Sequence, residues 1–337
     1  MKYFGKHTDL DNHSSKIGVL IANLGTPEAP KCPKLRTYLT EFLTDPRVIE
    51  LPGLLRQFLV RGIIINVRAH KSAAAYRTVW TDEGSPLMTH SVNFCDKLQS
   101  SLGQNYIVEL GMRYGKPSID SAIKNLHEQG IRNLIVLPMY PQYSGSTTGS
   151  IMDAVADSLK KIRWVPSLNF INQYHHNSDY INALCLSITE HWQKHGRAEK
   201  LIFSFHGIPQ RYVKNGDPYQ AHCEQTVAAV TKQLEMKEDE FLLVYQSRVG
   251  KEPWLQPYCD QTMQKLPQQG VKSVDVICAG FSADCLETIE EIKEENKEYF
   301  IESGGETFNY IECLNSHDDH ISMAKNIIYS TSLGFST

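Results

Sequence analysis

Short apolar runs that alternate with longer amphipathic stretches constrain the fold of this chain more than any other feature. The runs are rich in β-branched or aromatic residues and comprise Ile17–Asn23, Ile107–Met112, Leu134–Met139, Leu201–Phe205, Phe241–Tyr245 and Val274–Cys278. Strands that are buried on both faces have this composition. The stretches with helical spacing are Ser118–Gln129, Asn177–His195, Tyr219–Leu234 and Asp284–Phe300. Strands that alternate with helices in this way predict an α/β fold with parallel sheets.

The order of elements occurs twice, which predicts two domains. A chain of 337 residues is also long enough for about two. We expect an N-terminal α/β domain over 16–172, joined by a C-terminal helix over 317–330, and a C-terminal α/β domain over 173–316. Paired doubly wound domains hold their ligand in the cleft between them, at the carboxyl ends of the strands. We therefore expect the active site in an interdomain cleft.

Composition excludes several classes of function. The 34 Lys and Arg against 38 Asp and Glu give a net charge of −4, which argues against nucleic acid as a partner. No apolar stretch reaches the ~18 residues of a membrane span, and the polar first 15 residues do not resemble a signal peptide. Eight cysteines occur without a C-x-x-C pair, which is typical of reduced thiols in the cytoplasm.

Two acid–base side chains follow predicted strands of the second half. His206 stands in a tight turn with Gly207 and Pro209, which we expect to be exposed. Glu287 comes three residues after Asp284, a spacing that predicts a capping box at a helix N-terminus. A histidine and a carboxylate at one sheet edge suit Fe(II) binding or general acid–base catalysis. A core histidine with satisfied ring nitrogens and a purely capping glutamate are the structural alternatives.

Three other segments each have two interpretations. The loop 140–150 contains hydroxyls, glycines and two tyrosines, and either faces a ligand or caps a helix. Four glutamates share one face of an α-helix, either as a solvated face or as a path for cations: Glu287, Glu291, Glu294 and Glu298. The apolar segment 51–65 is either a core helix or a lip that touches a membrane.

Several motifs, taken together, carry a resemblance to a known family. They are Leu201–Arg211, Asn215–Tyr219, Tyr245–Gly250, Glu252–Leu255 and Gly280–Glu287, with Leu24–Pro27, Arg113–Tyr114, Pro141–Ser144 and Ser146–Gly149 in the first half. In this order they resemble the ferrochelatases, most closely the Gram-negative bacterial type, from about Ile17 to Asn326. The resemblance implies two Rossmann-like, chelatase-type domains. It also implies a lyase that inserts Fe(II) into protoporphyrin IX in the last step of haem biosynthesis, with release of two protons.

The resemblance also implies roles for single residues. His206 and Glu287 match the residues of metal binding and proton transfer. The positions that match the porphyrin pocket are Arg68, Lys71, Tyr76, Ser85, Arg113, Tyr114, Tyr143, Ser146 and Trp254. The match over the first four is looser, because Thr81–Gly84 carries an insertion.

Two positions depart from the family pattern. Cys285 stands where many relatives have a histidine, and we expect it to be a buried, inert thiol. Some relatives hold a [2Fe–2S] cluster with four cysteines, but here the loop position is Gly145 and no cysteine follows Cys313. We therefore expect no cluster and no permanently bound cofactor, since Fe(II) is a substrate.

The expected partners are protoporphyrin IX and Fe(II), with a peripheral membrane contact through 51–65, in the cytoplasm. Two other functions are compatible with the residues alone. One is a non-enzymatic carrier of tetrapyrrole or metal with two α/β lobes, which would not need both His206 and Glu287. The other is a chelatase for a different metal or tetrapyrrole.

Overall fold

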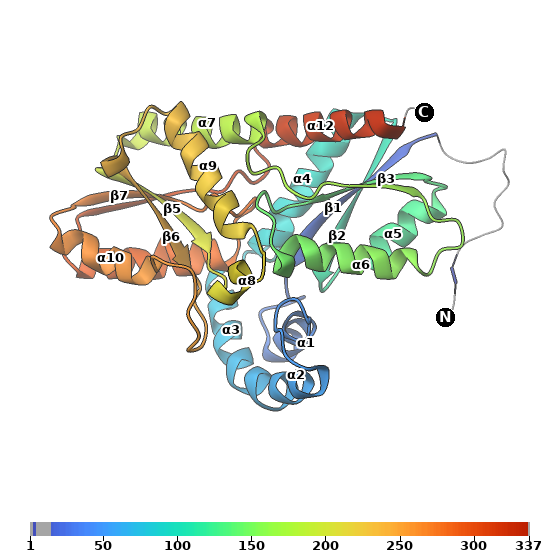
Figure 1. Cartoon of the computed structure of the whole chain (residues 1–337), viewed down its shortest axis with the longest axis horizontal. Helices are drawn as coiled ribbons and strands as arrows, with labels where there is room; N and C mark the ends of the chain where they lie inside the picture. Colours follow the sequence, from blue (N-terminus) through green and yellow to red (C-terminus); the bar gives the residue numbers. More distant parts are fainter. Residues whose placement is uncertain (1–2, 5–14, 336–337) are drawn as a thin grey trace. The chain divides into compact units, whose positions relative to one another are not determined.

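The computed structural model describes residues 3–4 and 15–335, which form two compact units (Figure 1). Unit 1 contains the described residues up to Met139, Gly145–Asn172 and those from Ile321 onward. Unit 2 contains Tyr140–Ser144 and Gln173–His320. The short segment Tyr140–Ser144 thus leaves the first sheet's unit and packs with the second.

Unit 1 is built on a four-stranded parallel sheet with the order β2-β1-β3-β4. Its strands are β1 Ile17–Gly25, β2 Tyr106–Tyr114, β3 Asn133–Pro138 and β4 Ser167–Phe170. Its helices are α1 Cys32–Leu43, α2 Gly53–Leu59, η2 Val60–Ile64, α3 Ile65–Val79, α4 Pro86–Leu102, α5 Ile119–Glu128, η3 Gly145–Gly149, α6 Ser150–Leu159, most of α12 Asp318–Ser332, and η6 Leu333–Phe335. Helices cover both faces of the sheet, and α1–α3 form a separate group beside it (Figure 1).

Unit 2 repeats this topology with the order β6-β5-β7-β8, again all parallel. Its strands are β5 Lys200–His206, β6 Phe241–Gln246, β7 Ser273–Ile277 and β8 Thr307–Ile311. Its helices are α7 Ser178–His195, α8 Gln210–Lys214, α9 Tyr219–Gln233, η4 Glu238–Glu240, α10 Cys259–Gln268, η5 Glu287–Asn296 and α11 Lys297–Glu302. The predicted α/β fold with two parallel sheets is therefore confirmed.

Local sequence explains where these elements begin. The middle of β1, Val19–Ala22, has no exposed surface, because helices cover both faces of its sheet. The side-chain oxygen of Asn177 accepts hydrogen bonds from the N–H groups of Asp179 and Tyr180 and so begins α7. Each of the six apolar runs contains a strand, so burial on both faces was a reliable signal.

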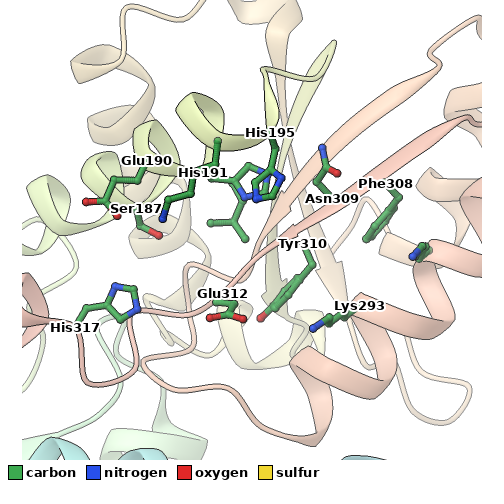
Figure 2. A pocket seen from close by; sticks show the side chains of 13 residues that line it. Ser187, Glu190, His191, His195, Lys293, Phe308, Asn309, Tyr310, Glu312 and His317 are labelled. Carbon is green, nitrogen blue, oxygen red and sulfur yellow. The ribbon is translucent and has the colours of Figure 1, made fainter.

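Strand β8 was not predicted, and it forms one edge of the sheet of unit 2. Its sequence Thr-Phe-Asn-Tyr-Ile mixes polar with apolar residues and is only partly buried. A groove of about 350 Å³ runs beside this strand (Figure 2).

Helix α2 contradicts one interpretation of segment 51–65, that of a core helix, while the contact with a membrane stays a prediction. Leu54 is 91% exposed and Phe58 is 68% exposed, so this helix is not part of the core. Leu51, Leu55, Ile63 and Val67 are exposed as well. These six side chains form what we call the apolar patch of unit 1.

Candidate active site

The carboxyl ends of β5, β6 and β7 position the candidate catalytic groups within unit 2. His206 is the last residue of β5 and pairs in register with Gln246, the last residue of β6. Glu287 follows β7, which lies on the other side of β5. Ligands of doubly wound sheets bind where neighbouring strands diverge in this way.

The turn after His206 is buried rather than exposed, which corrects the prediction. Gly207, Ile208 and Pro209 are buried, while His206 itself is half-buried. A Cβ atom at Gly207 would lie 3.0 Å from the Gln246 carbonyl oxygen, so the close approach of the two strand ends favours glycine. The Nδ1 atom of His206 lies 2.7 Å from the Gly207 carbonyl oxygen, and the imidazole centroid lies 6.4 Å from the Trp254 ring.

A buried glutamine joins this strand end to helix η5. The Gln246 side chain accepts a hydrogen bond from the Ser204 hydroxyl at 2.8 Å. Its amide nitrogen donates to the Glu287 carbonyl oxygen at 2.8 Å and to a Glu291 carboxylate oxygen at 3.3 Å. Sequence reasoning included Gln246 in a motif but gave it no role, although a polar residue at the end of an apolar strand was a usable signal.

Glu291 is the second carboxylate of this end of unit 2. The N–H of Ser247 donates to it at 2.6 Å, and the Ser247 hydroxyl donates to it as well. Ser247 has a φ of +65°, a backbone conformation that costs free energy in non-glycine residues and is concentrated at functional sites. Burial raises the pKa of Glu291, and Ser247 together with the nearby His206 offsets this only in part.

Helix η5 is a π-helix over Glu287–Asn296, which changes the predicted acidic face. The i→i+5 pairing of a π-helix turns the chain less per residue than an α-helix does. Glu287 and Glu291 are half-buried, whereas Glu294 and Glu298 are exposed. The prediction of one continuous face of four glutamates is therefore wrong, and only the first two belong to the candidate site.

The predicted capping box of Asp284 and Glu287 is also replaced by another arrangement. The Asp284 carboxylate accepts hydrogen bonds from three side chains, those of Thr288, Tyr310 and Asn315. The N–H of Cys285 donates to the Thr288 hydroxyl at 2.9 Å at the start of the helix. Burial holds the pKa of the Cys285 thiol well above its usual value, which agrees with an inert, protonated thiol.

Metal-binding groups are sparse in this site. Within residues 3–4 and 15–335, no three His, Cys, Asp or Glu side chains are arranged to hold a metal ion. The groups available at the strand ends are the imidazole of His206 and the carboxylates of Glu287 and Glu291.

Two further predicted residues belong to unit 2. Trp254 is half-buried, and its carbonyl oxygen accepts a hydrogen bond from Gln210 at 3.1 Å. The N–H of Tyr143 donates to Nδ1 of His222 at 3.2 Å. The His222 ring stacks on that of His175 with the centroids 3.8 Å apart, so a histidine pair holds the loop that presents Tyr143.

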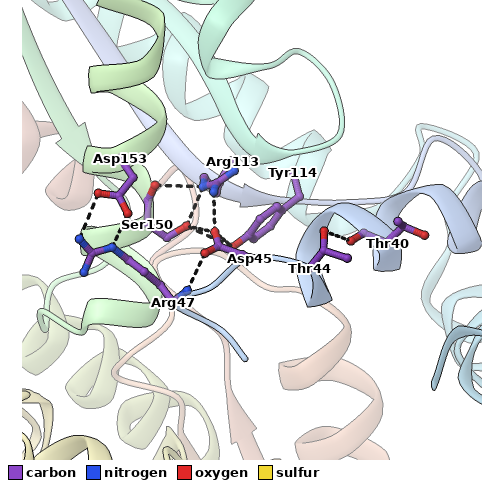
Figure 3. Close-up of polar contacts among 8 residues, drawn as sticks. All are labelled: Thr40, Thr44, Asp45, Arg47, Arg113, Tyr114, Ser150 and Asp153. Atoms are coloured by element: carbon purple, nitrogen blue, oxygen red, sulfur yellow. Dashed lines mark hydrogen bonds and ion pairs between the residues drawn. The ribbon is translucent and has the colours of Figure 1, made fainter. Parts of the chain in front are cut away.

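In unit 1, Arg113 and Tyr114 belong to a network centred on the buried carboxylate of Asp45 (Figure 3). Arg113 forms an ion pair with Asp45, and the Tyr114 hydroxyl donates to Asp45 at 2.9 Å. Ser150 donates to the same oxygen at 2.6 Å and accepts from Arg113. Burial alone would raise the pKa of Asp45, but the bonds from Ser150 and the charge of Arg113 lower it on balance. Sequence reasoning missed Asp45.

The remaining predicted residues occupy different positions in unit 1. Arg68 and exposed Lys71 lie one turn apart on α3, and buried Tyr76 packs against Trp80, the residue that follows this helix. Ser85 is buried, and its hydroxyl accepts the Met88 N–H at 3.3 Å as the N-cap of α4. Ser146 is half-buried in the π-helix η3.

Comparison with known proteins identifies the family. The family model for ferrochelatase matches residues 16–332. The chain belongs to the ferrochelatase family. It is thus a chelatase and a lyase of haem biosynthesis, which inserts iron into a porphyrin.

Individual ferrochelatases are similar over nearly the whole chain. That of Pseudoalteromonas atlantica is 51% identical over 97% of this chain and 92% of its own length. That of Idiomarina loihiensis is 50% identical over 100% of this chain and 93% of its own. Ferrochelatase 2 of Shewanella oneidensis is 51% identical over 93% of this chain and 97% of its own. These relatives confirm the predicted Gram-negative type.

Two solved structures share the fold at low sequence identity. SirB from Bacillus subtilis with Fe3+ has a TM-score of 0.56 and 9% identity, and the match covers 94% of this chain and 95% of that one. CbiX, described as the terminal enzyme for biosynthesis of siroheme in denitrifying bacteria, has a TM-score of 0.51 and 10% identity over 93% and 98% of the two chains. Ferrochelatase and these proteins thus share a chelatase fold.

We predict that His222 makes this ferrochelatase sensitive to acid. Burial and the neighbouring His175 lower the pKa of His222 to about 4, whereas an unfolded histidine titrates near 6.5. Below pH 6.5 the unfolded chain therefore binds a proton that the folded chain does not, so the free energy of unfolding falls towards pH 4. Between pH 7 and pH 4.5, His222→Asn should lose about 2 kcal/mol less stability than wild type in urea unfolding. The exposed His195→Asn serves as control, and equal losses in both variants would contradict the prediction.

Proposed function

We propose that His206 and Glu287 together catalyse insertion of Fe(II) into protoporphyrin IX. His206 accepts pyrrole protons and serves as a metal ligand, and Glu287 balances the charge and passes protons outward. The observation that carries this proposal is the side chain of Gln246, which bonds to η5 beside both glutamates and lies at the strand end paired with His206.

The chemistry requires each of these groups. Fe(II) must lose its water ligands, two N–H protons must leave the ring, and the flat ring must bend so that a nitrogen lone pair faces the metal. A neutral imidazole accepts a proton near pH 7, and a neighbouring carboxylate stabilises the resulting charge. Binding energy from the edges of the porphyrin can hold the ring in its bent form.

We also propose that Glu291 helps to supply Fe(II) to the catalytic residues. Its carboxylate is held by Ser247 and Gln246 beside the start of η5, whereas Glu294 is exposed to solvent. We infer that Fe(II) meets the oxygen atoms of Glu291 before it reaches Glu287.

We propose two kinds of role for the porphyrin residues. Arg68 and Lys71 carry positive charge on the surface of α3 and suit the propionate groups of the substrate. Tyr143 and Trp254 offer half-buried aromatic surface for the ring. Tyr76, Ser85 and Tyr114 are buried, so we propose that they position their neighbours, with Arg113 held by Asp45 and Ser146 presented by η3.

We propose that the apolar patch of unit 1 contacts a membrane surface. Its six side chains belong to one short segment and are exposed, which is costly in water and favourable at a lipid interface. The described helices include none that is both long and apolar enough to cross a bilayer. A surface contact at the membrane would deliver the apolar substrate without insertion.

We predict that His206 and Glu287 act as one catalytic unit. His206→Ala and Glu287→Gln should each lower kcat by roughly 10²-fold or more, which is the scale of general acid–base catalysis. The double variant should be little worse than the worse single one, because both residues serve the same step. Iron insertion is followed by the change in porphyrin fluorescence, and circular dichroism controls for folding. A folded single variant with near-normal kcat would refute the proposal.

We predict that Glu291 and Glu294 differ in metal supply. Glu291→Gln removes a carboxylate beside the site and should raise the KM for Fe(II) by roughly tenfold, equivalent to 1.4 kcal/mol. Glu294→Gln is the matched control, and its KM should stay within about twofold of wild type because surface charges contribute little. The KM for porphyrin should not change in either variant. Equal KM values for Fe(II) in the two variants would mean that Glu291 has no part in supply.

We predict that the apolar patch binds lipid vesicles. Leu54→Ser combined with Phe58→Ser should lower the vesicle-bound fraction by about tenfold or more, since each side chain contributes ~1.5–3 kcal/mol when buried. Val92→Ser with Val165→Ser removes two other exposed apolar side chains of unit 1 and is the control. If the patch variant sediments with the vesicles as much as the wild type does, the prediction of membrane contact through the patch is wrong.

We predict that the purified protein lacks a [2Fe–2S] cluster. A cluster needs four thiolates, but Cys313 alone follows Cys285, and burial keeps both thiols protonated by raising their pKa values. The visible absorption spectrum should show no iron–sulfur bands. Stoichiometric acid-labile sulfide would overturn this expectation.

A further inference from the structure

The groove beside β8 lies along the free edge of the sheet of unit 2. Five consecutive residues of the chain, from Phe308 to Glu312, line it. Successive side chains of a strand point to opposite faces of the sheet, so a cavity over one face would be lined by alternate residues only. Because the groove contacts consecutive residues of β8, it runs along the free edge of the sheet and not over one of its faces.

Two residues of β8 present their backbone groups to this edge. The N–H of Thr307 donates to the Lys272 carbonyl at 3.0 Å, so Thr307 faces β7. The N–H and C=O groups of successive residues point to opposite sides of a strand. The backbone groups of Asn309 therefore also point to β7, while those of Phe308 and Tyr310 point away from it. Strand β8 is the last strand in the order β6-β5-β7-β8, so no described strand pairs with the side that carries the outward backbone groups of Phe308 and Tyr310. Such an unpaired edge is a template for another strand.

Helices form the two walls of the groove (Figure 2). One face of α7 supplies Ser187, Glu190, His191, Lys194 and His195, and the opposite wall supplies Lys293 and Lys297. All three lysines are exposed and form no ion pair with any residue that the structure describes. The lining thus holds three lysines, at least one on each wall, and two carboxylates, those of Glu190 and Glu312.

We propose that this groove binds an extended acidic peptide of a partner protein as a fifth strand of unit 2. The outward N–H and C=O groups of Phe308 and Tyr310 would pair with the peptide backbone, which supplies affinity without regard to sequence. The lysines on both walls select acidic side chains and disfavour neutral or basic strands. This site is separate from the groups proposed for iron insertion.

The spacing of the lysines fits a strand with acidic residues at every second position. Alternate side chains of a strand lie ~6.7 Å apart on one face. Lys293 lies in the π-helix η5 and Lys297 begins α11 four residues later, so the two lysines are about one helical turn apart. Two glutamates on one face of a peptide strand can therefore meet two lysines of this wall.

A labelled peptide tests the proposal on the full-length protein. The probe is a fluorescein-tagged heptapeptide that alternates glutamate and valine, measured by fluorescence anisotropy. We expect saturable binding that weakens by roughly tenfold or more in the double variant Lys293→Glu/Lys297→Glu. The control is Lys232→Glu/Lys265→Glu, which reverses two exposed lysines of unit 2 outside the groove and should leave binding unchanged. Equal weakening in both variants would overturn the proposal.

Peptide variants separate strand addition from adsorption by charge, and they need only the wild-type protein. N-methylation of one alternate set of peptide residues removes the N–H groups that face β8, whereas methylation of the other set leaves them. We expect the two methylated peptides to differ in affinity by roughly tenfold or more. Hydrogen exchange at Phe308 and Tyr310 should slow when the unmodified peptide binds.

Three other results would refute the proposed occupant. Equal affinity of the two methylated peptides would mean that charge alone holds the probe. Displacement of the peptide by millimolar inorganic phosphate at matched ionic strength would indicate a pocket for small anions. Concentration-dependent dimers in sedimentation velocity that the lysine variant abolishes would place a second copy of this chain on the edge.

Discussion

The carboxamide of Gln246 holds together the segments that carry the candidate catalytic groups. It bonds to Ser204 on β5 and to the start of η5 at Glu287, and the Cys278 thiol after β7 lies 3.7 Å from the same amide. A buried amide that loses one of these partners is left with an unsatisfied polar group, which costs ~1–3 kcal/mol. The strand ends and the helix are therefore fixed to one another through hydrogen bonds, not through apolar packing alone.

In unit 1, Asp45 joins separate segments of the chain through hydrogen bonds, as Gln246 does in unit 2. Its carboxylate binds Arg113, Tyr114 and Ser150, which belong to β2 and α6. A buried carboxylate is stable only when charge and hydrogen bonds compensate for lost hydration. The network around Asp45 thus fixes the orientation of the Arg113 guanidinium.

Much of the fold could be predicted, because apolar runs and helical periodicity report burial directly. Strands buried on both faces, such as β1 and β5, consist mostly of apolar residues, so few polar positions obscure the signal. Edge strand β8 escaped prediction because one side of it faces the groove, which tolerates Asn309 and Tyr310 among apolar residues. His206 and Glu287 were found because they follow predicted strands, and Gln246 ends a strand in the same way. Asp45 matters through long-range bonds that no local spacing reveals.

Because η5 is a π-helix, the number of residues between Glu287 and Asn296 affects the geometry of the site. In such a helix, the relative direction of Glu287 and Glu291 depends on how many residues each turn contains. Removal of one residue from this stretch would favour ordinary α-helical turns and rotate the two carboxylates relative to each other, although every charged group would be retained. The orientation of the two carboxylates therefore depends more on the number of residues in this segment than on the identity of exposed side chains such as Glu294.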